Sequence, residues 1–127
     1  MRTYVVAGVS LLAGIMVGGV AMQGPRAQGA APVYYVVEVD VVEPDGYERE
    51  YLPRARDLIR ASGGRPVAAG VPAMVAGDPP KSRVGIYAWD NMDQLQRWFS
   101  SPAFQELRRT GQRYARFRNY AISGIAQ

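Results

Sequence analysis

The sequence contains no histidine and no cysteine among its 127 residues. Without histidine, Ser-His-Asp and Cys-His catalysis, His-ligated haem and nearly all zinc sites are excluded. Without cysteine, no disulfide can stabilise the fold. Any proton transfer must therefore use a carboxylate, a tyrosine, the single lysine (Lys81) or the ligand itself. These absences lead us to predict that the protein uses no cofactor and no metal.

The charge balance gives little support for a nucleic-acid partner. Fifteen Lys and Arg residues face eleven Asp and Glu residues, a formal charge of +4. Arg2 and Arg26 lie in the N-terminal segment, so the rest of the chain has thirteen basic against eleven acidic residues, or +2. Near the end, five arginines alternate with aromatic residues, and we interpret them as a solvated helix face, with anionic lipid or ligand contact as the alternative: Arg108, Arg109, Arg113, Arg116 and Arg118.

Residues 1–30 have the layout of a signal peptide. Met1-Arg2 is a short basic start, residues 4–22 carry no charge, and residues 27–31 are small residues and one glutamine. We predict cleavage after Gly29 or Ala30 and a periplasmic or secreted protein. The alternative is an uncleaved inner-membrane anchor, since about 20 apolar residues span a bilayer. In that case the domain faces the periplasm, and the protein is held at the membrane only through its N-terminal segment.

Residues 31–127 are predicted to form one domain that opens with a strand at 33–42. The odd positions of this strand are apolar, while Tyr34, Glu38 and Asp40 share the other face with valines. Two further strands are predicted at 65–71 and 82–89, and a last strand at 116–125.

Helices are predicted between the first and second strands and between the third and fourth. Pro53 should kink or split the first helix near Leu52, because proline donates no backbone hydrogen bond. Asp90 is expected to cap the second helix, and Ser101-Pro102 to restart it. The order is βαββαβ, which predicts an α+β, ferredoxin-like fold: an antiparallel four-stranded sheet with both helices on one face.

Two helices can cover only one face of the sheet. The predicted core face takes Tyr35, Val37, Val39, Val84, Ile86 and Ala88, and the opposite face Tyr34, Val36, Glu38, Asp40, Val42, Arg83, Tyr87 and Trp89. Large aromatics left in water would form an adhesive patch, and a small domain without disulfides needs more burial. We therefore predict a homodimer in which two sheets meet face to face around an interior cavity.

Three segments together resemble a known family: strand 33–42 with Glu43-Pro44-Asp45-Gly46-Tyr47, then Gly63-Gly64-Arg65, then residues 98–104, Trp-Phe-Ser-Ser-Pro-Ala-Phe. Their order is similar to that in the bacterial domain of unknown function 1330, of the dimeric α/β-barrel superfamily, over residues 32–127. Relatives in that superfamily include cofactor-free monooxygenases, haem-degrading proteins and small isomerases. The resemblance implies a pocket between sheet and helices or inside the barrel, and it supplies no catalytic set.

The candidate binding residues lie on the predicted open face. Glu38 and Asp40 project the same way, and in a cavity one of them could act as a general acid or base. The plainer interpretation is that Arg83, on the neighbouring strand, pairs with one of them. Tyr34, Tyr87 and Trp89 either wall a pocket or pack at the dimer interface.

Three functions are open at this point. The first is a binding or accessory domain for a small aromatic or anionic molecule. The second is a cofactor-independent oxygenase or isomerase that uses a carboxylate, and the third is a purely structural interaction module.

Overall fold

The computed structural model of the chain describes residues 31–126. The signal peptide predicted for residues 1–30 lies outside these residues. Across 31–126, no helix is both long enough and apolar enough to cross a membrane.

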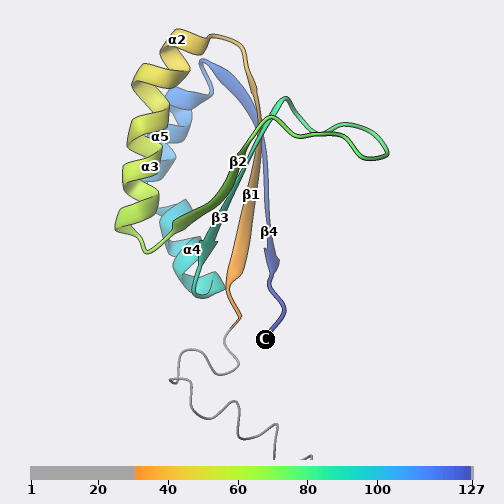
Figure 1. Cartoon of the computed structure of the whole chain (residues 1–127). Helices are drawn as coiled ribbons and strands as arrows, with labels where there is room; N and C mark the ends of the chain where they lie inside the picture. The colour runs from red at the N-terminus through yellow and green to blue at the C-terminus, as the bar shows by residue number, and fades with distance from the viewer. Residues whose placement is uncertain (1–30, 127) are drawn as a thin grey trace, which may run out of the picture. The chain divides into compact units, whose positions relative to one another are not determined.

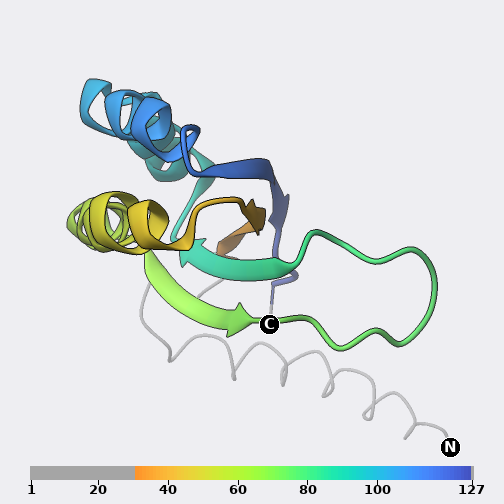
Figure 2. The same ribbon diagram turned by 90° about the horizontal axis from the view of Figure 1, so that it is seen from above.

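The domain is an antiparallel sheet covered on one face by helices, as predicted (Figure 1). The strand order is β2-β3-β1-β4, so the first strand is central and pairs with both the third and the fourth. The view from above shows all the helices on the same side of the sheet (Figure 2). The strands are β1 (Val33–Val41), β2 (Arg65–Gly70), β3 (Arg83–Trp89) and β4 (Ala115–Ser123).

The first helical segment is interrupted just before Pro53, as the sequence predicted. It consists of α2 (Pro44–Gly46), a π-helical turn η1 (Tyr47–Tyr51) and α3 (Leu52–Ala61). Proline cannot donate to the carbonyl four residues back, and the chain responds with a wider turn in which the Leu52 N–H donates to Tyr47 O. α3 ends at Ala61, and Gly63, two residues further on, has a φ of +94°, a left-handed conformation that glycine adopts without strain.

The second helical segment consists of α4 (Met92–Ser100) and α5 (Pro102–Gly111). Ser101 caps α5 as predicted, because its side chain accepts a hydrogen bond from the Phe104 N–H at 3.2 Å. The predicted cap at Asp90 is wrong by one residue: Asn91 caps α4 and accepts from the Gln94 N–H at 2.9 Å. Both residue types suit this position, so the sequence alone does not separate them.

Aromatic rings fill the space between the sheet and the helices. Trp98 and Phe104 have ring centroids 4.2 Å apart, and the Tyr35 ring meets Trp98 edge-on at 5.2 Å. Trp89 is completely buried in the same cluster. Burial of several large rings on one sheet face gives this small domain its core without a disulfide.

The faces of β3 are the reverse of those predicted. Tyr87 lies opposite Tyr35 and Trp89 opposite Val33, so both aromatics point to the helices. Val84, Ile86 and Ala88 lie on the face away from the helices, which we call the open face. The prediction was wrong because both sets of alternate positions in β3 carry apolar residues, so periodicity did not favour one face.

Residues 71–82 form an arm between β2 and β3. The arm extends beyond the sheet on the side opposite the helices (Figures 1 and 2). Its apolar side chains stay in water: Val71 is 81% exposed and Val75 is 96% exposed.

Candidate functional site

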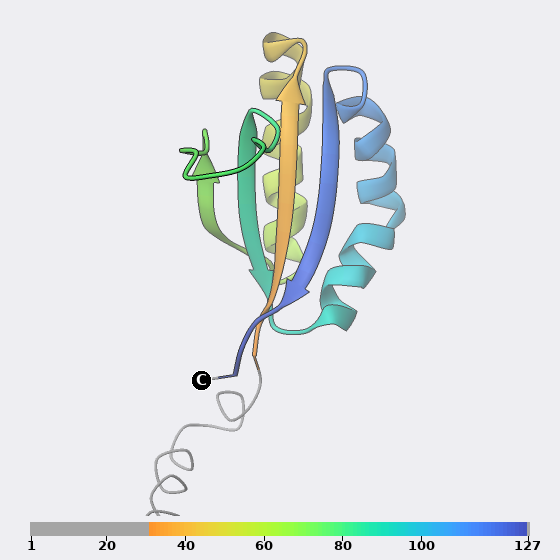
Figure 3. The same cartoon turned by 90° about the vertical axis from the view of Figure 1, so that its right-hand side faces the viewer.

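A groove of about 220 Å³ lies between α4 and β4, at the free edge of the sheet. Figure 3 shows this helix beside the edge strand. The lining is mostly apolar and contains no charged side chain; it consists of Tyr35, Met92, Leu95, Gln96, Phe99, Ser100, Asn119, Tyr120 and Ala121. We call it the α4–β4 groove.

The local sequence explains why the groove is open. Met92, Leu95 and Phe99 recur at helical spacing, so α4 turns an apolar stripe toward the sheet. On β4 the facing positions are Asn119 and Ala121, which are opposite Val37 and Tyr35 of β1. These two side chains are smaller than the phenylalanine at 117, and both line the groove.

Three buried side-chain polar atoms have no hydrogen-bond partner within residues 31–126: Oε1 of Gln94, Nε1 of Trp98 and Oδ1 of Asn119. Asn119 belongs to the groove lining, while the side chain of Trp98 is almost fully buried in the core. Leaving a buried polar atom unpaired costs free energy, and natural proteins seldom do so without a functional reason. An acceptor and a donor are therefore both free on this side of the sheet.

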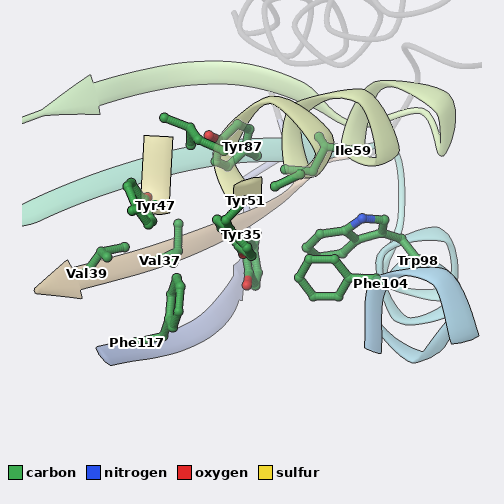
Figure 4. A pocket seen from close by; sticks show the side chains of 12 residues that line it. Tyr35, Val37, Val39, Tyr47, Tyr51, Ile59, Tyr87, Trp98, Phe104 and Phe117 are labelled. Atoms are coloured by element: carbon green, nitrogen blue, oxygen red, sulfur yellow. The ribbon is translucent and has the colours of Figure 1, made fainter. Parts of the chain in front are cut away.

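A second, smaller hollow lies deeper between the sheet and the first helical segment, and we call it the tyrosine cavity (Figure 4). Its volume is about 40 Å³, which is room for about one water molecule. Four tyrosines from three elements line it: Tyr35 of β1, Tyr47 and Tyr51 of η1, and Tyr87 of β3. Tyr35 also lines the α4–β4 groove, so one side chain borders both spaces.

The π-helical turn places two of these tyrosines. Tyr47 and Tyr51 stack with ring centroids 5.5 Å apart, and both are buried. Burial raises the pKa of all four tyrosines, most strongly for Tyr35 and Tyr51. They therefore remain protonated at neutral pH and can donate hydrogen bonds, but they are poor bases.

Glu38 and Asp40 lie on the open face, away from both hollows, as the sequence predicted. Glu38 is buried although charged, and its carboxylate accepts from Arg118 at 3.0 Å, from the Tyr120 hydroxyl at 3.2 Å and from the Lys81 N–H at 3.2 Å. Arg118 and the other donors hold the pKa of Glu38 below its ordinary value, against the opposing effect of burial.

Asp40 is bound in a similar way. It accepts from the Ser82 N–H at 2.8 Å and from Lys81 Nζ at 3.3 Å. The hydrogen bond from the Ser82 N–H is the main reason that the pKa of Asp40 is lowered. Both carboxylates are therefore poorly suited to take up a proton near neutral pH.

The predicted pairing of Arg83 with Glu38 or Asp40 is wrong. Arg83 shares the face of Tyr87, lies 3.6 Å from Glu48 and stacks over the Tyr47 ring at 5.7 Å. Because β3 presents the opposite face to that predicted, Arg83 sits on the helix side of the sheet. Arg118 of β4 takes its place beside Glu38.

The structure therefore divides the six predicted site residues between the two faces. Tyr34, Glu38 and Asp40 are on the open face, while Arg83, Tyr87 and Trp89 are on the helix face. Of the six, Tyr87 borders the tyrosine cavity and none lines the α4–β4 groove.

Asn119 and Trp98 were not predicted from the sequence, because an asparagine in a strand and a tryptophan in an apolar helix stripe are both common. Of the two, Asn119 could have been identified from the sequence, because it is a polar residue at a core-facing position of the last strand. Within the part of the chain that the structure describes, no group of three acidic side chains could hold a metal ion.

Fold and site together define a class of protein: a ferredoxin-like, α+β domain with a mostly apolar groove between sheet and helices. The chain belongs to the family described as domain of unknown function (DUF1330), which it matches over residues 32–125. A comparison with curated proteins finds no match.

Solved structures share the fold. The chain is similar to SnoaB from Streptomyces nogalater, described as a cofactor-independent oxygenase, with 17% identity and a TM-score of 0.57 over 77% of this chain and 97% of SnoaB. It is also similar to a protein of unknown function from Rhodopseudomonas palustris, with 16% identity and a TM-score of 0.54 over 77% of this chain and 85% of that one. At such identities the likeness concerns the fold and does not assign chemistry.

Proposed function

We propose that this protein binds a small, planar, largely apolar molecule in the α4–β4 groove. The observation that carries the proposal is the unpaired, buried Oδ1 of Asn119, a residue that lines a mostly apolar groove of about 220 Å³. Small-molecule sites typically combine apolar walls with a few polar groups that fix orientation. Asn119 supplies such a group, and the ligand would donate a hydrogen bond to it.

Size and charge narrow the class of ligand. An apolar cavity of about 150 Å³ holds benzene, so this groove has room for one or two fused rings. The groove lining has no charged side chain, which favours a neutral aromatic molecule over an anionic one. A ring hydroxyl or ring N–H would supply the proton for Asn119.

A titration with 2-naphthol tests this. The chain has two tryptophans, and Trp98 lies 5.2 Å from Tyr35 of the groove, so binding should change the tryptophan fluorescence. Ala121→Phe fills the groove and should weaken binding at least tenfold. The matched control is Ala61→Phe, at an exposed alanine at the end of α3, which should leave binding unchanged. Equal binding by both variants would contradict the proposal.

The protein is proposed to act as a homodimer joined through the open faces of two sheets. Several apolar side chains support this, since Tyr120 and Ile122 are 49% and 61% exposed and Val36, Val84 and Ile86 line a hollow beside them. Sedimentation of the full-length chain at micromolar concentration should give twice the monomer mass, and a monomer would refute this part.

Export to the periplasm is also part of the proposal. It is supported by the basic, then apolar, then small-residue order of residues 1–30. Mass spectrometry of a periplasmic fraction should find a mature chain that begins after Gly29 or Ala30. Full-length protein in the membrane fraction would favour the anchor.

A second candidate is cofactor-independent oxygenation of a bound phenol. The specific observation is Arg108, whose guanidinium lies 5.0 Å from the centre of the Phe99 ring at the groove. A positive charge near the ring would stabilise the phenolate that remains when the phenol gives its proton to water. The phenolate can then pass two electrons to oxygen, so that a diol becomes a quinone and oxygen becomes hydrogen peroxide. Glu38 and Asp40 take no part, because they lie on the other face. Oxygen uptake with naphthalene-1,4-diol should exceed the uncatalysed rate and fall in Arg108→Gln.

A further inference from the structure

The arm between β2 and β3 bounds a second hollow, on the open face. This open-face groove has a volume of about 490 Å³ and is bounded by the sheet on one side and by the base of the arm on the other. The arm side consists of Val71, Pro72 and Pro80, and the sheet side consists of Val36, Glu38, Ala68, Ala69, Gly70, Val84, Ile86 and Tyr120. The lining is largely apolar, so water is a poor occupant.

The arm offers an apolar surface and keeps it away from its own sheet. Val75 is 96% exposed, Val71 81% and Met74 47%. In Figures 1 and 2 the arm extends past the sheet on the side opposite the helices. Three exposed apolar side chains on one projecting segment are unusual for a surface that remains in water.

Hydrogen bonds fix the end of the arm at Lys81 and Ser82, where the chain enters β3. Asp40 accepts from the Ser82 N–H at 2.8 Å and from Ser82 Oγ at 3.1 Å, and Glu38 accepts from the Lys81 N–H at 3.2 Å. Glu38 is fixed in turn by Arg118 and Tyr120 of β4. The two carboxylates therefore fix the direction in which the arm leaves the sheet, which gives them a structural role.

We infer that the arm is a reciprocal clasp: in the homodimer, each arm lays Met74 and Val75 on the open face of the second copy. The inference rests on the proposed dimer. An apolar arm and an apolar groove occur on the same side of one chain, and a two-fold axis between two facing sheets brings each arm over the other groove. The charges are complementary, because the arm carries Asp78 while Arg116 of β4 is exposed and is in none of the ion pairs within residues 31–126.

Disulfide trapping tests the contact directly, since the 127-residue chain has no cysteine of its own. The variant with both Val75→Cys and Ile86→Cys should, on mild oxidation, form a covalent dimer between chains. The two single variants, each tested alone, should form at least tenfold less of it. A disulfide within one chain, or no disulfide at all, overturns the clasp.

Sedimentation distinguishes a dimer that forms without the arm contact from a protein that does not dimerise. Val75→Asp should raise the dimer dissociation constant at least tenfold, while the control Val67→Asp, at an exposed valine of β2, should change it less than threefold. A wild-type dimer that Val75→Asp leaves unchanged overturns the clasp and keeps the sheet-mediated dimer. A monomeric wild type overturns both.

Discussion

Replacing Asn119 by leucine should stabilise the domain and weaken ligand binding at the same time. Leucine has the same number of side-chain heavy atoms as asparagine and carries no polar atom. In the native chain, Oδ1 of Asn119 is buried without a partner within residues 31–126. The substitution therefore removes the cost of burying this atom and also removes the acceptor that we assign to the ligand.

The magnitude follows from the burial of the amide. An unpaired buried polar group costs about 1–3 kcal/mol. Asn119 is only partly buried as a whole, so the lower end applies and the expected gain is about 1 kcal/mol. For a domain of this size, about 1 kcal/mol raises the melting temperature by about 4–8 °C. Loss of one hydrogen bond to the ligand should weaken 2-naphthol binding by about tenfold.

Urea denaturation and the fluorescence titration measure the two effects on the same protein. Leucine also suits a strand better than asparagine does, so Ser123→Leu, on the same face of β4 but exposed, controls for strand preference. A loss of stability in Asn119→Leu would show that the amide supports the fold. Unchanged binding would show that Asn119 does not contact the ligand.

Three further predictions concern the fold. Gly64→Ala should destabilise by about 1–3 kcal/mol in urea denaturation, because the added Cβ would lie 2.6 Å from the Trp89 ring; a neutral result would mean that the ring moves freely. Ser101→Ala should cost about 1 kcal/mol through loss of the cap on the Phe104 N–H, and Ser101→Thr should restore most of it. Glu38 has a lowered pKa, so its stabilising effect is present above its ordinary value of 4.5 and disappears as the pH falls through the folded-state pKa. Glu38→Gln should therefore be less stable than wild type at pH 7, and the difference should shrink on acidification; a difference that grows would contradict the assignment.

The order of elements was predictable from the sequence because each boundary has a local chemical signal. Pro53 forced the break before α3, Ser101-Pro102 began α5, and Gly63 lies just after the end of α3. The alternation in β1 predicted correctly which side of that strand meets the helices. These signals act within a few residues, so one sequence is enough to read them.

The candidate site was not predictable in the same way. The face of β3 depends on its register with β1, and that register is set by packing across the sheet. From the sequence, the aromatic side chains of Tyr87 and Trp89 suited a dimer interface as well as a core. In the structure both lie on the helix face of the sheet. Asn119 is a candidate because its Oδ1 has no hydrogen-bond partner within residues 31–126. Only the three-dimensional arrangement of β4 and α4 shows this.

A crystal structure of the protein grown with 2-naphthol tests the central claim most directly. The account predicts one naphthol between α4 and β4, with its hydroxyl within hydrogen-bonding distance of Asn119 Oδ1 and its rings against Met92 and Phe99. An empty α4–β4 groove, with naphthol bound only on the open face of the sheet, would contradict it.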